Sequence, residues 1–226
     1  MTSPRVSFVS LGCPKNLVDS EVLLGHLVKA GFGLETHYED SDVVVVNTCG
    51  FLKASEDESM ETIDRMVKLK EDGKLKAVVV AGCLPQRYGP AFASKLRNVD
   101  AVLGITDRDK IGEVCERLLE RTGKPKQINL VTTDLPKYEI DRDRLRITPK
   151  HMAYVRLSEG CNHTCAFCII PQIRGKFRSK PMEVVIDEVR KLASDGCKEV
   201  TLIAQDSTYY GLDLRPNHSR AISSPE

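Results

Sequence analysis

The chain has 226 residues, of which 41% are hydrophobic and 29% charged, a composition typical of a globular protein with one full domain and part of another. Its 33 lysines and arginines nearly balance its 32 aspartates and glutamates, so overall charge favours neither a nucleic-acid nor a membrane partner. We find no signal-peptide pattern and no apolar run near the roughly 18 residues of a membrane span, so a cytoplasmic protein without membrane contact is expected.

The first part of the chain, up to Thr122, alternates short apolar runs with amphipathic stretches. Near-continuous hydrophobic runs are typical of parallel strands that are covered on both faces. Such runs predict strands at Arg5–Leu11, Asp42–Asn47, Lys76–Ala81 and Ala101–Ile105, with a less regular one at Gly33–Tyr38. The expected fold class is therefore α/β, with an open parallel sheet and flanking helices.

Helical periodicity predicts the flanking helices at Asn16–Ala30, Lys53–Lys70 and Asp107–Arg121. Asn16 is the expected N-cap of the first helix, and Gly31 is its expected stop. Cys115 lies on the apolar stripe of the third helix and is expected to be a core residue.

Residues 123–150 interrupt this alternation with prolines and charged residues, which predicts a linker with one short strand at Ile128–Val131. A strand, helix and strand follow, at His151–Leu157, Met182–Ser194 and Glu199–Ala204, as at the start of a β/α barrel. The expected domains are thus residues 1–122, a linker at 123–150, an incomplete second domain at 151–214 and a disordered tail at 215–226.

The loop after the first strand of the second domain carries three cysteines in a CxxxCxxC spacing: Cys161, Cys165 and Cys168. A structural zinc site needs four protein ligands, and bacterial ferredoxin runs are spaced differently. Three cysteines on a 4Fe-4S cluster would leave one iron open for a small molecule. The alternative is a zinc site completed by His163.

Three further cysteines, Cys13, Cys49 and Cys83, each follow a predicted strand of the first domain. Open α/β sheets bind ligands at the carboxyl ends of their strands, so these thiols are expected to converge and to hold a second cluster. Each adjoins a glycine, which suits close packing against a cluster. The alternative is that each is a small buried residue, which is our interpretation of Cys197.

Five motifs together resemble the methylthiotransferase family of radical S-adenosylmethionine (SAM) enzymes: LGCPKNLVDSE, VNTCGF, AGCLPQRY, SEGCNHTCAFCIIPQIRG and AQDSTYYG. The Pro-Lys-Asn after Cys13 resembles the RimO-like branch, which modifies an aspartate of a ribosomal small-subunit protein. The tRNA-modifying branch more often has Gln-Met-Asn there. A tRNA adenosine methylthiotransferase, or an iron-sulfur carrier without SAM chemistry, are the alternative functions.

This resemblance implies two 4Fe-4S clusters and SAM as cofactors, with the three cysteines of the loop holding the radical-generating cluster and the three of the sheet an auxiliary one. It implies that the β-carbon of an aspartate in ribosomal protein S12 receives a methylthio group, with a flavodoxin or ferredoxin as reductant and no nucleic-acid partner. Phe167 is expected near the SAM adenine, and Gln205 near the SAM amino group. Both follow from the resemblance alone.

Family members continue through the rest of a partial barrel and a small β domain, whereas this chain reaches only the first β-α-β unit. We therefore expect a truncated or alternatively terminated product with little or no turnover. The basic run Arg174, Lys176, Arg178 and Lys180 is interpreted as a solvated face, with contact to the SAM carboxylate or to an acidic substrate loop as the alternative.

Overall fold

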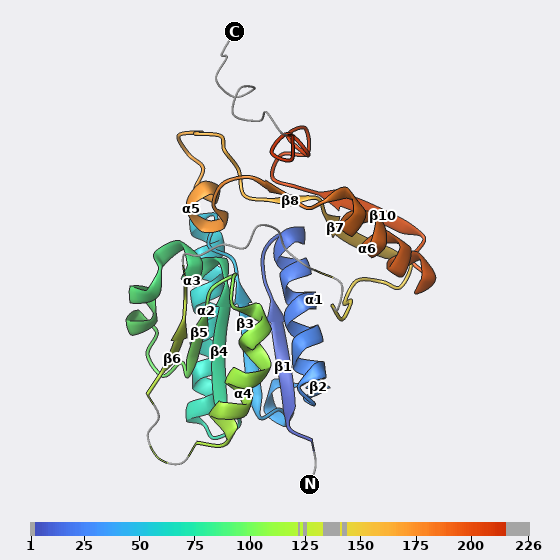
Figure 1. The fold of residues 1–226 in the computed structure, drawn as a ribbon. Coiled ribbons are helices and arrows are strands. Elements are labelled where there is room, and N and C mark those ends of the chain that lie inside the picture. The colour runs from blue at the N-terminus through green and yellow to red at the C-terminus, as the bar shows by residue number, and fades with distance from the viewer. Residues whose placement is uncertain (1–2, 122, 124–125, 133–140, 142–143, 216–226) are drawn as a thin grey trace. The chain divides into compact units, whose positions relative to one another are not determined.

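The computed structural model describes residues 3–121, 123, 126–132, 141 and 144–215 (Figure 1). They form two compact units. The first holds the described residues up to 132 together with 144 and 145, and the second holds residue 141 and residues 146–215. Most of the predicted tail lies outside the described residues.

The first unit is built on a six-stranded sheet with strand order β2-β1-β3-β4-β5-β6, and all of its strand pairs are parallel. The strands are β1 (Arg5–Ser10), β2 (Gly33–Glu35), β3 (Val43–Thr48), β4 (Ala77–Gly82), β5 (Ala101–Leu103) and β6 (Ile128–Leu130). Every residue of β3 and β4 is buried, as expected for continuous hydrophobic runs between two helical layers. The predicted α/β class is confirmed.

Helices cover both faces of this sheet (Figure 1). They are α1 (Pro14–Lys29), α2 (Lys53–Glu71), α3 (Cys83–Tyr88) and α4 (Ile111–Leu119), with 3-10 turns at Tyr38–Asp40, Pro90–Lys95 and Arg108–Lys110. Apolar side chains of α1 and α4 form one core layer, and those of α2 and α3 belong to the other. None of the helices in the described ranges is both long and apolar enough to cross a membrane.

Two predicted helix starts were wrong. Helix α1 begins at Pro14 with Cys13 as its N-cap residue, because proline at the first helical position needs no N–H partner. Asn16, the predicted N-cap, lies inside the first turn and is completely buried. The predicted helix from Asp107 is a 3-10 turn followed by α4, and Cys115 lies in the core as expected.

The second unit contains the predicted β-α-β arrangement, in which β7 (Met152–Arg156) and β10 (Glu199–Ile203) pair in parallel. Helix α6 (Met182–Ser194) packs on β7, with Val155, Leu192 and Cys197 in a small apolar core. Two short strands, β8 (Ser158–Glu159) and β9 (Arg178–Ser179), pair antiparallel, and α5 (Ile170–Arg174) lies between them in sequence.

Candidate metal centres

The first three cysteines follow the carboxyl ends of three adjacent strands, β1, β3 and β4. In the sheet register Thr48 pairs with Gly82, so the residues that follow them, Cys49 and Cys83, leave the sheet at the same level. Ser10 pairs with Asn47, which brings the segment with Cys13 to the same edge. The three segments therefore end at one edge of the sheet, as parallel strands require, and the convergence of their thiols stays a prediction.

Glycines let these segments pack directly against one another. A Cβ at Gly12, where φ is +92°, would lie 2.7 Å from the Cβ and 3.0 Å from the Sγ of Cys49. A Cβ at Gly50 would lie 2.9 Å from the Cα of Leu84, beside Cys83. A cluster is the expected close neighbour of these glycines, but at Gly12 and Gly50 the close neighbours are other cysteine-bearing segments.

One side chain contacts all three segments. Asn16 donates from Nδ2 to the carbonyl of Leu11 at 2.6 Å and to that of Thr48 at 3.2 Å. Its Oδ1 lies 3.9 Å from the Sγ of Cys83, which donates to it. Sequence reasoning missed this role, although Pro14 could have signalled that the helix begins before Asn16.

The chemistry of this edge suits an iron-sulfur cluster. All eight cysteines of the chain are free; Cys13 is exposed, whereas Cys49 and Cys83 are buried. Within the described part of the chain, no three His, Cys, Asp or Glu side chains already surround a position for one metal ion. Thiolates on different irons of a cluster need not converge on one point, and three thiols beside an accessible edge are a donor set that fits such a cluster.

The second trio lies in the loop between β8 and α5, which is held by its own backbone hydrogen bonds. The N–H of Cys161 donates to the carbonyl of Gly175 at 3.1 Å, and the N–H of Cys168 donates to that of Cys165 at 3.0 Å. Cys165 is exposed, and the other two thiols are half-buried. A loop with its ends tied and its thiols accessible fits a cluster that must also admit a small molecule.

His163 is engaged by an acidic side chain. Its Nε2 lies 2.8 Å from Oδ2 of Asp206, whose other oxygen accepts from the hydroxyl of Thr208 at 2.6 Å. The hydrogen bonds from Thr208 and then from His163 lower the pKa of Asp206. The structure gives no support to His163 as a fourth zinc ligand. Gln205 precedes Asp206 and is half-buried, while Phe167 is 89% exposed, so their contacts with SAM stay predictions.

A continuous chain of buried ion pairs leads to the cysteine loop. The distances between charged atoms along it lie between 2.7 and 3.1 Å, and every side chain is at most 3% exposed. Its order is Glu188, Lys180, Asp141, Arg156, Glu159 and Arg174. Because Glu159 precedes the cysteines and Arg174 follows them, their pair joins the two ends of the loop at 2.7 Å.

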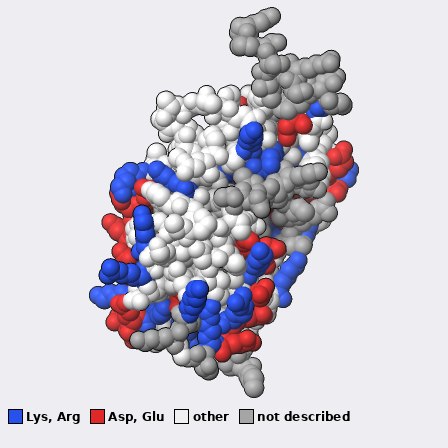
Figure 2. All heavy atoms as spheres, turned by 60° about the vertical axis from the view of Figure 1, so that its left-hand side comes forward, with Lys and Arg blue, Asp and Glu red and all other residues white. Residues whose placement is uncertain are grey.

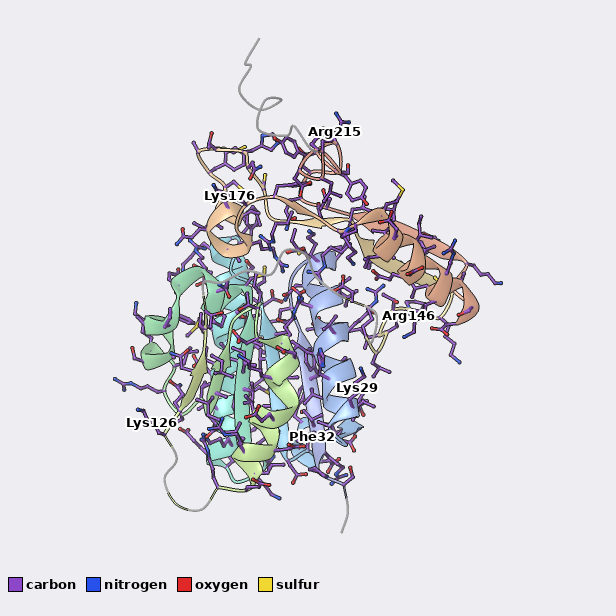
Figure 3. The ribbon with its side chains drawn as sticks, in the orientation of Figure 1. Lys29, Phe32, Lys126, Arg146, Lys176 and Arg215 are labelled. Carbon is purple, nitrogen blue, oxygen red and sulfur yellow. The ribbon has the colours of Figure 1, made fainter. Side chains whose placement is uncertain are left out.

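The basic run was only partly a solvated face. Lys176, which is labelled in Figure 3, is exposed. Arg174 and Lys180 are buried and paired with acids of their own unit, so neither the solvated face nor contact with an acidic ligand describes them. Their partners lie 15, 39 and 8 positions away, which a local pattern of charges does not show.

Two family models match the chain, and each match contains one of the two cysteine trios. Residues 5–104, with the first trio, match the model described as uncharacterized protein family UPF0004. Residues 155–220, with the second trio, match the radical SAM superfamily.

Curated relatives are similar in sequence over nearly the whole length of this chain. The protein named ribosomal protein uS12 methylthiotransferase RimO from Geobacter sulfurreducens is 42% identical over 93% of this chain and 46% of its own length. The protein of the same name from Opitutus terrae is 43% identical over 97% of this chain and 49% of its own length. The chain thus spans about half the length of the curated relatives it matches.

The fold is shared with a solved radical SAM methyltransferase, TsrM from Kitasatospora setae, at a TM-score of 0.58 and 13% identity over 98% of this chain and 50% of the other. At that identity the likeness concerns the fold alone. The two matched domains, each with its cysteine trio, and the similarity to RimO sequences together show that this chain belongs to the methylthiotransferase family of radical SAM proteins.

Proposed function

We propose that this chain supplies the ligands of two 4Fe-4S clusters and the first part of the SAM site in an enzyme that adds a methylthio group to the β-carbon of an aspartate in a ribosomal small-subunit protein. The observation that carries this proposal is the presence of two separate cysteine trios, each one ligand short of a closed site. The similarity to proteins named for uS12 methylthiotransfer supports the substrate.

The loop cysteines Cys161, Cys165 and Cys168 are proposed to hold the radical-generating cluster. A cluster of this kind, with SAM bound, supplies the one-electron chemistry that activates an inert carbon–hydrogen bond. The chain's own contribution is orientation: the Glu159–Arg174 pair fixes the ends of the loop, and the remaining coordination position is left to SAM. Phe167 and Gln205 are proposed to contact SAM.

The sheet cysteines Cys13, Cys49 and Cys83 are proposed to hold the auxiliary cluster. The hydroxyl of Ser59 on α2 accepts from the N–H of Cys49 at 3.2 Å and lies 2.9 Å from its carbonyl oxygen, which fixes the middle ligand. Burial of two of the three thiols keeps water from much of this site. Three thiolates on four irons would leave one iron without a protein ligand.

A protein substrate agrees better than tRNA with the distribution of charge. On the face in Figure 2, lysines and arginines are interspersed with aspartates and glutamates, so no large basic area stands out. A flavodoxin or ferredoxin is the proposed reductant, and the cytoplasm is the proposed location, because ribosomal protein would be the substrate.

The proposal is tested on the chain reconstituted anaerobically with iron and sulfide. We expect about eight irons per chain, falling to about four when either trio is replaced by alanine. SAM should change the paramagnetic spectrum of the reduced protein only when the loop trio is intact. Uptake of one cluster or none, or a spectrum indifferent to SAM, would contradict the proposal. Parallel incubations of a full-length homologue with ribosomal protein and with tRNA compare the two substrates.

A further inference from the structure

Asn16 occupies an unusual position for its residue type. An asparagine inside a helix competes with the backbone for hydrogen bonds and is disfavoured there unless its amide is otherwise bonded. Here the side chain is completely buried, and it is bonded outside its own helix, to the ends of β1 and β3. The location of these partners suggests a role at the strand ends rather than in α1.

The carbonyl partners fix which way the amide faces. Nδ2 points to three backbone carbonyls, those of Leu11, Asn47 and Thr48, and only a donor is favourable there. Oδ1 is therefore the atom directed at the Sγ of Cys83, 3.9 Å away. Turning the amide would set its oxygen against three carbonyl oxygens, so this orientation is strongly preferred.

A second asparagine supports the first. Asn47, on β3 between the other two cysteine-bearing strands, donates from Nδ2 to the carbonyl of Asn16 at 3.0 Å and to the hydroxyl of Ser20 at 2.8 Å. It is also completely buried. Its Oδ1 is buried without a hydrogen-bond partner among the described residues, so the network is satisfied through the two donated hydrogen bonds, and these fix the arrangement of the two amides.

We propose that Asn16 is a positioning residue for the auxiliary cluster: its amide ties the ends of β1 and β3 together and presents its oxygen to the sulfur of Cys83, so that it sets both the spacing of the three thiols and the local field at one of them. This inference rests on the proposed function, because it needs a cluster at that edge. It makes Asn16 neither an iron ligand nor a participant in the transfer reaction.

The chemistry at Cys83 follows from that orientation. The thiol proton that Oδ1 accepts leaves to solvent when the sulfur binds iron as a thiolate. The negative end of the amide dipole then faces a cluster ligand and opposes the addition of an electron. Asn16→Asp keeps the size of the side chain but replaces the donor by a second oxygen and adds a charge, so it should lower the reduction potential of the cluster.

The experiment uses the full chain with Cys161, Cys165 and Cys168 replaced by alanine, so that only the auxiliary cluster remains. Asn16→Asp and Asn16→Ala are each compared with the same substitutions at Asn129, which also donates to one backbone carbonyl but lies exposed on β6. Iron per folded chain, the reduction potential and the circular dichroism spectrum are measured.

We expect at least a twofold loss of iron in both Asn16 variants and a more negative potential in Asn16→Asp, with the Asn129 variants unchanged. Folded Asn16 variants with the parent's iron content and potential would overturn the inference. Failure of both variants to fold would also overturn it, because Asn16 would then serve general stability. If the parent itself binds no iron, the proposed function fails first.

Discussion

Asp141→Asn tests the buried chain of charges in the second unit. The carboxylate of Asp141 is fully buried and accepts from Nη2 of Arg156 at 2.9 Å, from its Nε at 3.2 Å and from Nζ of Lys180 at 2.7 Å. Among the described residues, this network of ion pairs contains three acids and three bases. The substitution therefore leaves one excess positive charge where every other side chain is at most 3% exposed.

The expected cost is large because the partners cannot reach water. Removing one member of a buried ion pair costs about 3–5 kcal/mol, since an uncompensated charge stays behind. Asparagine keeps one oxygen that can accept from one of the two bases, so we expect the lower end, about 3 kcal/mol. That corresponds to roughly a hundredfold fall in the ratio of folded to unfolded molecules of the second unit.

Hydrogen exchange followed by mass spectrometry measures this unit separately from the sheet unit. Amides of β7 and α6 should exchange about a hundred times faster in Asp141→Asn, while those of β3 and β4 keep their parental rates. The matched control is Asp187→Asn, whose carboxylate pairs with Arg190 at 3.4 Å on the surface, with side chains 50% and 76% exposed.

Exposed pairs contribute only about 0–1 kcal/mol, so the control should hardly change the exchange of β7. Equal effects of the two substitutions would refute the reasoning, because burial would then not distinguish the two carboxylates. Faster exchange throughout the sheet unit as well would refute it in another way, since the six described members of the ion-pair network all belong to the second unit.

Two further predictions concern the sheet unit. Gly12→Ala should lower its stability by about 1–3 kcal/mol in thermal unfolding, since φ is +92° and the new Cβ would lie 2.7 Å from that of Cys49. The control is Gly73→Ala, because Gly73 has a φ of +77° but open space around it, so this substitution measures the backbone strain without a steric clash. An equal loss of stability in Gly73→Ala would contradict the packing argument. Burial raises the pKa of the Cys115 thiol to about 12. In the folded, metal-free chain at pH 8, an alkylating reagent should therefore modify exposed Cys13 readily and Cys115 only after unfolding. Mass spectrometry follows the labelling, and early modification of Cys115 would contradict its burial.

The sequence predicted the larger elements because their patterns are local. Strands β3 and β4 are buried on both faces, and their continuous apolar runs placed them to within one residue. Helix α6 has the predicted bounds, with Gly196 after it at φ +89°. Helices α3 and α5 were missed, because 6 and 5 residues are too few to show a helical period.

The candidate sites were predictable as far as they depend on strand ends. Three cysteines that each follow the carboxyl end of a parallel strand must lie at the same edge of the sheet. The predicted strands alone placed Cys13, Cys49 and Cys83 at that edge. The role of Asn16 could not be predicted from helix-capping rules, because its partners are carbonyls of two strands. The ion-pair chain was equally hidden, since its members come from separate segments.

The two thiol trios require different amounts of folded chain. Cys161, Cys165 and Cys168 lie within eight consecutive residues, so they stay near one another even in an unstructured polypeptide. The trio of the sheet exists as a group only after β1, β3 and β4 have paired. Assembly of the two proposed clusters would therefore follow an order: iron could bind the loop thiols before the chain has folded, whereas binding at the sheet thiols would require the paired strands.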